Sequence, residues 1–186
     1  VKKCIGGGEE SFGFLPCAKV RDKASPASIC MIGELAAWPQ DNGKTLYDLL
    51  MDIYTEYGFS METTINVVKP GKSGADEIKQ MMTDFRTTPP QVIGGSKVVL
   101  WKDYQTLEKT DAEGNVSKLD RPDTSNVLQW FCEDGTKISV RPSGTEPKIK
   151  FYIEIKDNTM KCAGCYQRCT DNAKIKVDEI KKSLNL

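Results

Sequence analysis

The feature that most constrains the fold is an alternating segment near the end of the chain, residues 148–155. Its apolar positions are Ile149, Phe151, Ile153 and Ile155, and they alternate with Lys148, Lys150, Tyr152 and Glu154. Successive side chains of a β-strand point to opposite faces, so this alternation predicts a strand with one face in a core and the other toward water. Antiparallel sheets commonly have one covered and one solvated face.

The segments around this strand predict an α+β fold. Residues 127–132 and 136–140 flank Glu133-Asp134-Gly135, a turn sequence that favours a β-hairpin. Near the end of the chain, one stripe at helical spacing is formed by Ala173, Val177, Ile180 and Leu184. Strands accompanied by such helices predict an antiparallel sheet with helices on one face.

The first part of the chain is helical in pattern. Ser25 and Pro26 favour a helix start, with Ser25 as the N-cap. Residues 27–37 are apolar almost all round, which predicts a buried helix, and Pro39 is expected to end it.

A second helix is predicted to open at Thr45, with Asp48 three residues on as a capping box. After it the pattern changes from helix to strand, near residues 58–63. We therefore expect two domains, residues 1–58 and residues 59–186.

Charge and composition exclude several classes of protein. Lys+Arg and Asp+Glu balance at 26 each, so no long-range field attracts nucleic acid or an anionic membrane. No apolar stretch has the length of a membrane span, and the N-terminus is too short for a signal peptide. The seven cysteines are odd in number and mostly scattered, which indicates free thiols in a reducing cytoplasm. The chain has no histidine, the usual general base.

The segment from Arg141 to Lys148, RPSGTEPK, has the residue types of a concave anion site. Arg141 offers a planar fork of donors matched to phosphate oxygens, and Lys148 adds a point charge. Ser143 and Thr145 add hydroxyl donors, and Gly144 lets the backbone approach closely, as in an anion nest. The alternative is a solvated turn, since these residues are common in turns.

Two acids and a hydroxyl follow a glycine run in GGEESFG, residues 7–13. Carboxylates such as that of Glu9, next to a hydroxyl such as that of Ser11, are suited to reading sugar hydroxyls. An exposed acidic turn is the alternative. Arg21 and Lys23 follow in VRDK, and the residues alone indicate for Lys23 a surface lysine ahead of a helix cap.

These motifs resemble those of the α-D-phosphohexomutase superfamily, in its phosphoglucomutase/phosphomannomutase branch. RPSGTEPKIKFYI is similar to the family's C-terminal phosphate-binding loop, GEES with an aromatic and Gly to its sugar-specificity loop, and VRDK to its VRDKD segment. GKTLYDLLMDIYTEYG, KPGKSGADEIKQMM and SNVLQWFCEDG extend the resemblance over nearly the whole chain. The sequence departs from the pattern at Ala24, where the family usually has aspartate.

The resemblance implies a fold, a domain assignment and a reaction. Residues 1–58 would be the end of the third domain, an incomplete α/β piece. Residues 59–186 would be the fourth domain, a twisted antiparallel sheet backed by helices (TATA-binding-protein-like). The reaction would be that of an isomerase, which interconverts hexose 1-phosphate and hexose 6-phosphate through a bisphosphorylated sugar.

The resemblance also implies roles for individual residues. Arg141, Ser143, Gly144, Thr145 and Lys148 would bind the phosphate that is not reacting. The sugar 3- and 4-hydroxyls would be contacted by Glu9 and Ser11, with Lys23 and Arg21 reaching the same cleft.

The family's catalytic serine and its aspartate-rich magnesium loop have no counterpart in this sequence, so we expect no cofactor here and no activity from this chain alone. Mg²⁺ and glucose 1,6-bisphosphate are implied for the full-length enzyme. The expected partners are glucose 1-phosphate, glucose 6-phosphate and mannose phosphates, together with domains 1 and 2 of the same enzyme. The sequence does not separate glucose from mannose.

Two alternatives concern the cysteine cluster and the function of the chain. Cys162, Cys165 and Cys169 lie within eight residues and are either reduced thiols at the start of the last helix or ligands of zinc or an iron–sulfur cluster. The chain is alternatively a non-catalytic binding module for nucleic acid or a protein partner. Lys148, Lys150 and Lys156 share a strand, but the zero net charge and Glu154 between them favour a solvated edge.

Overall fold

The computed structural model describes residues 4–9, 13–19, 22–71, 73–121 and 123–186. The chain divides between Tyr57 and Gly58 into two compact units, which are described separately below. No helix in these ranges is long and apolar enough to cross a membrane.

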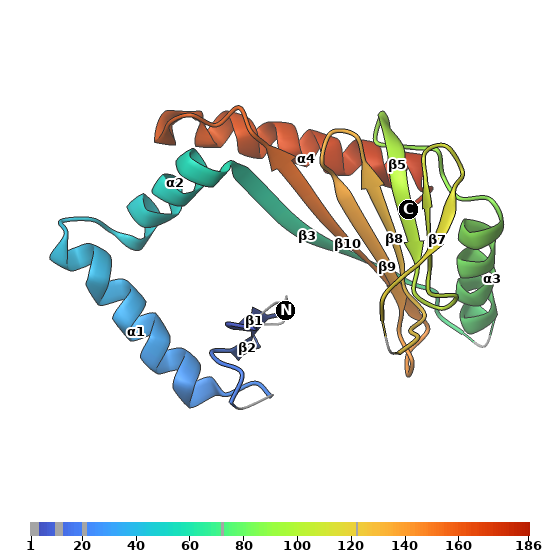
Figure 1. Cartoon of the computed structure of the whole chain (residues 1–186), viewed down its shortest axis with the longest axis horizontal. Coiled ribbons are helices and arrows are strands. Elements are labelled where there is room, and N and C mark those ends of the chain that lie inside the picture. Colours follow the sequence, from blue (N-terminus) through green and yellow to red (C-terminus); the bar gives the residue numbers. More distant parts are fainter. Residues whose placement is uncertain (1–3, 10–12, 20–21, 72, 122) are drawn as a thin grey trace. The chain divides into compact units, whose positions relative to one another are not determined.

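In the second unit, the described residues build an antiparallel sheet of eight strands (Figure 1). The strand order is β3-β10-β9-β8-β5-β6-β7, and β4 pairs with β5 beside this path. The strands are β3 (Phe59–Val68), β4 (Val92–Ile93), β5 (Ser96–Asp103), β6 (Glu108–Asp111), β7 (Val116–Lys118), β8 (Leu128–Cys132), β9 (Lys137–Pro142) and β10 (Lys148–Asp157). With its helices the unit has the predicted α+β fold.

Strand β10 lies between β3 and β9 and confirms the alternation predicted for it. Ile149, Phe151 and Ile153 are buried, whereas Lys148, Lys150, Tyr152 and Glu154 on the opposite face are half-buried. The predicted hairpin is formed by β8 and β9, with a positive φ at Gly135 in its turn. Glycine adopts this conformation without strain. The type of turn that it allows fixes the register of β8 on β9.

Two helices pack against this sheet, α3 (Gly74–Thr87) and α4 (Tyr166–Ser183), and the short 3-10 helix η1 (Ala163–Cys165) precedes α4 (Figure 1). Helix α3 meets the buried face through Phe85, whose ring centroid lies 5.2 Å from that of Trp130 and 6.2 Å from that of Phe151. Helix α4 contacts β10 and β3, and its predicted stripe is buried at Ala173, Val177 and Ile180. One face of the sheet is thus a core, and the opposite face carries the polar side chains of β10.

In the first unit, the described residues form two short strands and two helices. Strand β1 (Gly7–Gly8) pairs with β2 (Phe14–Leu15), and the helices are α1 (Ser25–Asp41) and α2 (Leu46–Tyr57).

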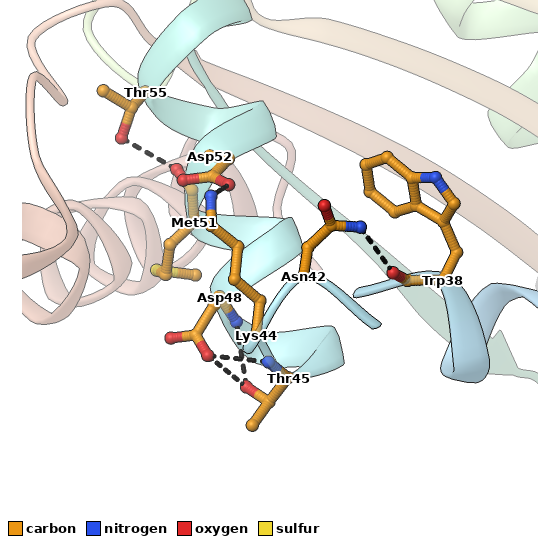
Figure 2. Close-up of polar contacts among 8 residues, drawn as sticks. All are labelled: Trp38, Asn42, Lys44, Thr45, Asp48, Met51, Asp52 and Thr55. Atoms are coloured by element: carbon orange, nitrogen blue, oxygen red, sulfur yellow. Dashed lines mark hydrogen bonds and ion pairs between the residues drawn. The ribbon is translucent and has the colours of Figure 1, made fainter. Parts of the chain in front are cut away.

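The capping box predicted for the second helix is confirmed at the start of α2. The Asp48 carboxylate accepts the Thr45 N–H at 2.8 Å, and the Thr45 hydroxyl accepts the Asp48 N–H at 3.2 Å (Figure 2). The Thr45 hydroxyl also donates to the Asp48 carboxylate at 2.7 Å, and this bond, followed by the bond from the Thr45 N–H, lowers the pKa of Asp48. Two backbone N–H groups that the helix itself leaves unpaired are thereby satisfied.

Helix α1 differs from its prediction in three ways. Ser25 is its first residue rather than its N-cap, and no side chain caps the preceding Ala24. Pro39 lies inside the helix, which continues to Asp41, because a proline so close to the end removes few helical hydrogen bonds. The predicted burial is wrong: Ile29 is 69% exposed and Trp38 is 61% exposed. Apolar composition alone does not supply a partner surface, and the described residues leave these two side chains exposed.

Candidate functional site

The clearest candidate site is the hairpin end between β9 and β10, residues 141–148, which we call the β9–β10 loop. The Ser143 N–H donates to the Lys148 carbonyl at 2.9 Å, and the Lys148 N–H donates to the Glu146 carbonyl at 2.7 Å. The Pro147 carbonyl accepts the Lys69 N–H at 2.9 Å, which ties the loop to the end of β3. The backbone of the loop is therefore held from both sides.

The hydroxyl of Ser143 organises the tip of this loop. Its oxygen accepts the N–H of Thr145 at 3.4 Å and the N–H of Glu146 at 3.3 Å, as in a Ser/Thr turn. The hydroxyl proton is not used in either bond and can be donated to another group.

Gly144 is exposed at the tip of the loop. Its φ is not positive, and a Cβ added there would meet nothing within 4 Å. The fold itself therefore does not require glycine at position 144. A need for glycine there would come from a ligand that approaches the loop.

Three cations meet on the solvated face of the sheet beside this loop. Arg141 of β9 lies directly opposite Lys150 of β10 in the strand register, and Lys148 lies two residues before Lys150. They share a hollow of about 430 Å³, lined by Arg141, Pro142, Ser143, Gly144, Thr145, Lys148, Lys150 and Tyr152. Like charges directly opposite across two strands are unfavourable, and an anion held between them offsets that repulsion.

One carboxylate, that of Glu146, balances part of this charge. It forms an ion pair with Lys148, and the pKa of Glu146 is lowered chiefly by the hydrogen bond and charge of Lys148 and less by the charge of Lys150. Because Glu146 pairs with Lys148, a phosphate entering the hollow would compete with Glu146 for Lys148.

The interpretation of Lys150 as part of a solvated edge is wrong. Strand β10 is flanked by β3 and β9, and Lys150 is half-buried, with its Nζ 5.8 Å from the centroid of the Tyr152 ring. Lys150 and Tyr152 are the two lining residues that sequence reasoning missed. The period of two already placed them on the face of Lys148, but only the hairpin register sets Lys150 opposite Arg141.

A second candidate site lies in the first unit, where two of the predicted sugar-contacting residues meet. Lys23 Nζ lies 2.8 Å from Glu9 Oε1, and both side chains are partly exposed. The Glu9 N–H donates to the Gly13 carbonyl at 2.9 Å, which extends the β1–β2 pairing. The pKa of Lys23 is raised by its hydrogen bond to Glu9 and by the charge of Glu9.

Glu9, Lys23 and the neighbouring Asp22 line a shallow hollow of about 270 Å³ with the glycines of β1. A carboxylate that accepts one lysine proton keeps further lone pairs for hydroxyl donors. The other predicted sugar residues, Ser11 and Arg21, lie outside the described residues.

No group of three or more His, Cys, Asp or Glu in the part of the chain that the structure describes could hold a metal ion. This includes the three clustered cysteines near α4. Cys162 is exposed and Cys165 is half-buried, whereas Cys169 is buried in the helix.

Comparison with known proteins gives a family match within the second unit. Residues 91–161, which include β5 to β10 and the β9–β10 loop, match the phosphoglucomutase/phosphomannomutase C-terminal domain. The chain contains a phosphoglucomutase/phosphomannomutase C-terminal domain.

Curated relatives extend the likeness to most of the chain. It is 40% identical over 149 residues to a phosphoglucomutase of Staphylococcus aureus, which covers 80% of this chain. It is 35% identical over 147 residues to a phosphoglucomutase of Staphylococcus haemolyticus, which covers 79% of this chain. The aligned part spans about 27% of the length of each relative.

A solved structure supports the fold. The chain is similar to the open form of the exocytosis-sensitive phosphoprotein parafusin, a phosphoglucomutase from Paramecium, with a TM-score of 0.51 and 17% identity. The match covers 96% of this chain and 31% of parafusin.

Proposed function

We propose that this chain supplies sugar-phosphate binding to a phosphohexomutase, an isomerase that interconverts hexose 1-phosphate and hexose 6-phosphate through a bisphosphorylated sugar. The observation that carries the proposal is the cluster of Arg141, Lys148 and Lys150 around one hollow beside a hydroxyl-rich loop. Homology to phosphoglucomutase supports the same choice of ligand.

In this proposal the β9–β10 loop holds the phosphate that is not reacting. The guanidinium of Arg141 contacts two phosphate oxygens, and Lys148 and Lys150 add charge. Ser143 and Thr145 donate their hydroxyl protons, and the open space at Gly144 lets the phosphate approach the backbone. Since the bisphosphorylated sugar binds in two orientations, the loop accepts either of its phosphates in turn. Such positioning and charge neutralisation dominate catalysis of phosphoryl transfer.

The first unit would hold the sugar ring. Glu9 accepts hydrogen bonds from the sugar hydroxyls, assisted by Ser11, with Lys23 and Arg21 nearby. The ion pair of Glu9 with Lys23 supports this role, because it orients the carboxylate before the sugar arrives. Both glucose and mannose present suitable 3- and 4-hydroxyls.

We assign residues 59–186 to the fourth domain and residues 1–58 to the end of the third. The exposed apolar side chains of α1 and α2 are suited to contact with further parts of a longer enzyme, domains 1 and 2 among its partners.

The resemblance implies a magnesium ion for the full-length enzyme. The described residues of this chain offer no cluster of three carboxylate, histidine or cysteine ligands that would hold it. No residue assigned here acts as a nucleophile either, so we expect binding but no turnover from this chain alone.

The proposal is tested by calorimetric titration of the chain with glucose 1-phosphate, with inorganic phosphate as competitor. Loss of a hydrogen bond to a charged group weakens binding by about 1.5–3 kcal/mol, roughly ten- to a hundredfold in Kd. We expect this loss for Arg141→Ala and for Lys150→Ala.

Lys156→Ala is the matched control. Lys156 lies on the same strand, six residues beyond Lys150, where it pairs with Glu154 at 3.1 Å. The Lys156→Ala variant removes the same charge from the other end of β10. It should change the Kd for glucose 1-phosphate by less than about twofold. Equal losses in Lys156→Ala and Arg141→Ala, or no phosphate-sensitive binding by the wild type, would contradict the proposal.

One observation favours a second candidate function, binding of a longer polyanion such as nucleic acid. Lys102 of β5 lies directly opposite Lys109 of β6, and its Nζ sits 4.6 Å from the centroid of the Phe131 ring. Burial and the neighbouring charges of Lys109, Arg121 and Lys137 lower the pKa of Lys102. Salt-sensitive oligonucleotide binding abolished by Lys102→Ala would support this function, and its absence would leave the sugar phosphate as the ligand.

A further inference from the structure

The cysteines near α4 include a pair that the proposed function does not use. Cys162 and Cys165 lie in the segment between β10 and α4, just beyond the region that matches the C-terminal domain. Their sulfur atoms are 3.2 Å apart. A disulfide bond needs roughly 2.05 Å, so the sulfurs must approach by only about 1 Å.

The backbone between the two cysteines is already folded for this approach. The Cys165 N–H donates to the Cys162 carbonyl at 3.0 Å and closes a turn of four residues. Such a turn holds its first and last Cα atoms within about 7 Å, the range in which cysteines are bridged. Little backbone movement is therefore required.

The pair is also open to reagents in solution. Cys162 is exposed and Cys165 is half-buried. By contrast, burial raises the pKa of Cys169, one turn further along α4, and raises that of Cys132 to about 11. These two thiols are protected from oxidation, because the thiolate is the reactive form.

The surroundings of Cys165 favour its thiolate. Its pKa is lowered chiefly by the hydrogen bond from the Cys162 thiol, then by backbone N–H groups, and further by the charge of Arg168. Cys165 also directly precedes α4, whose N-terminal N–H groups favour a negative charge. Of the two thiols, Cys165 is therefore the better nucleophile.

We propose that Cys162 and Cys165 are a redox-active dithiol that forms a reversible intramolecular disulfide by exchange with a small disulfide of the glutathione class. The Cys165 thiolate attacks one sulfur of the small disulfide, whose S–S bond breaks and releases one small thiolate. The Cys162 sulfur then attacks Cys165, forms the Cys162–Cys165 bond and releases the second small thiolate. The two cysteine protons pass to the two released thiolates, so the cysteines are oxidised and the small disulfide is reduced.

This dithiol is separate from the β9–β10 loop, and the two lie at opposite ends of β10 (Figure 1). Strand β10 has ten residues, which corresponds to about 30 Å at the usual rise. Oxidation of the pair should therefore leave glucose 1-phosphate binding unchanged, and the inference does not depend on the proposed function.

The test is incubation of the whole chain with oxidised glutathione, followed by alkylation, trypsin digestion and mass spectrometry. Cleavage after Lys161 and Arg168 releases one peptide that holds Cys162 and Cys165 but not Cys169. We expect this peptide to become lighter by two hydrogen atoms, reversibly with dithiothreitol, and about tenfold faster than the exposed Cys17 or Cys30 gains glutathione.

Three single variants separate the steps. Cys162→Ser should accumulate a glutathione adduct on Cys165, Cys165→Ser should react more slowly at Cys162, and Cys169→Ser should behave as the wild type. The inference is overturned if the peptide gains no internal disulfide, if it reacts no faster than Cys17, or if only disulfide-linked dimers form.

Discussion

The ion pair between Arg86 and Asp103 should be the polar contact whose loss most weakens the second unit. Arg86, in the last turn of α3, donates from Nε to Asp103 Oδ2 at 2.9 Å and from Nη2 to Asn126 Oδ1 at 2.7 Å. The Asp103 side chain is only 4% exposed, and its Oδ1 also accepts the Gln105 N–H at 2.8 Å. The pair joins α3 to the end of β5 and to the loop before β8.

The loss of stability expected for Arg86→Ala depends on the groups that stay around the Asp103 carboxylate. Removing one partner of a buried pair costs about 3–5 kcal/mol, because the other charge stays buried. The Gln105 N–H still donates a hydrogen bond to Asp103, and the Arg86 side chain is itself 21% exposed. We therefore expect a loss of stability at the lower end of this range, about 3 kcal/mol. For a unit of this size such a loss lowers Tm by roughly 10 °C.

Urea and thermal unfolding followed by circular dichroism measure this loss. Lys79→Ala is the matched control, since Lys79 lies on the same helix but pairs with Asp76 where both side chains are 79% exposed. The control should change stability by less than about 0.5 kcal/mol. A loss below about 1 kcal/mol for Arg86→Ala, or one equal to that of the control, would refute the reasoning.

Three further predictions concern single positions. Burial raises the pKa of Cys132 to about 11, so the folded state keeps this proton where the unfolded thiol, near its ordinary value of 9, loses it. Stability should then fall by about 1–2 kcal/mol between pH 9 and 11 in the wild type, and by less in Cys132→Ala, as measured by urea unfolding at each pH. Thr45→Ala should destabilise the start of α2 by about 1 kcal/mol, seen as faster hydrogen exchange of its first amides; unchanged exchange would show that the capping box contributes nothing. A Cβ at Gly74 would lie 1.8 Å from the Lys69 carbonyl oxygen, so Gly74→Ala should lower Tm strongly, whereas Gly144→Ala should leave Tm unchanged and weaken phosphate binding. Equal Tm values for the two glycine variants would contradict this contrast.

Local signals predicted the fold well where neighbouring residues determine it. The alternation in β10, the turn at Gly135 and the stripe of α4 each depend on residues close in sequence, and all three are confirmed. The Thr45–Asp48 capping box is confirmed for the same reason.

What the sequence could not predict depends on distant partners. The pattern of residues 27–37, apolar almost all round, predicts a buried helix, but burial needs a surface that the helix itself does not encode, and Ile29 and Trp38 are exposed. The interpretation of Lys150 as a solvated edge residue is wrong because the local pattern does not give the register of β9 on β10. That register places Lys150 opposite Arg141.

The central claim is that the β9–β10 loop binds the phosphate of a hexose phosphate, and NMR titration of the ¹⁵N-labelled chain with glucose 1-phosphate tests it most directly. The account predicts saturable shifts of the Ser143, Gly144 and Thr145 amides, with smaller shifts along β10 near Lys150 and none at Lys156. Shifts centred instead on Lys102 and Lys109, or no saturable shift in the loop, would contradict it.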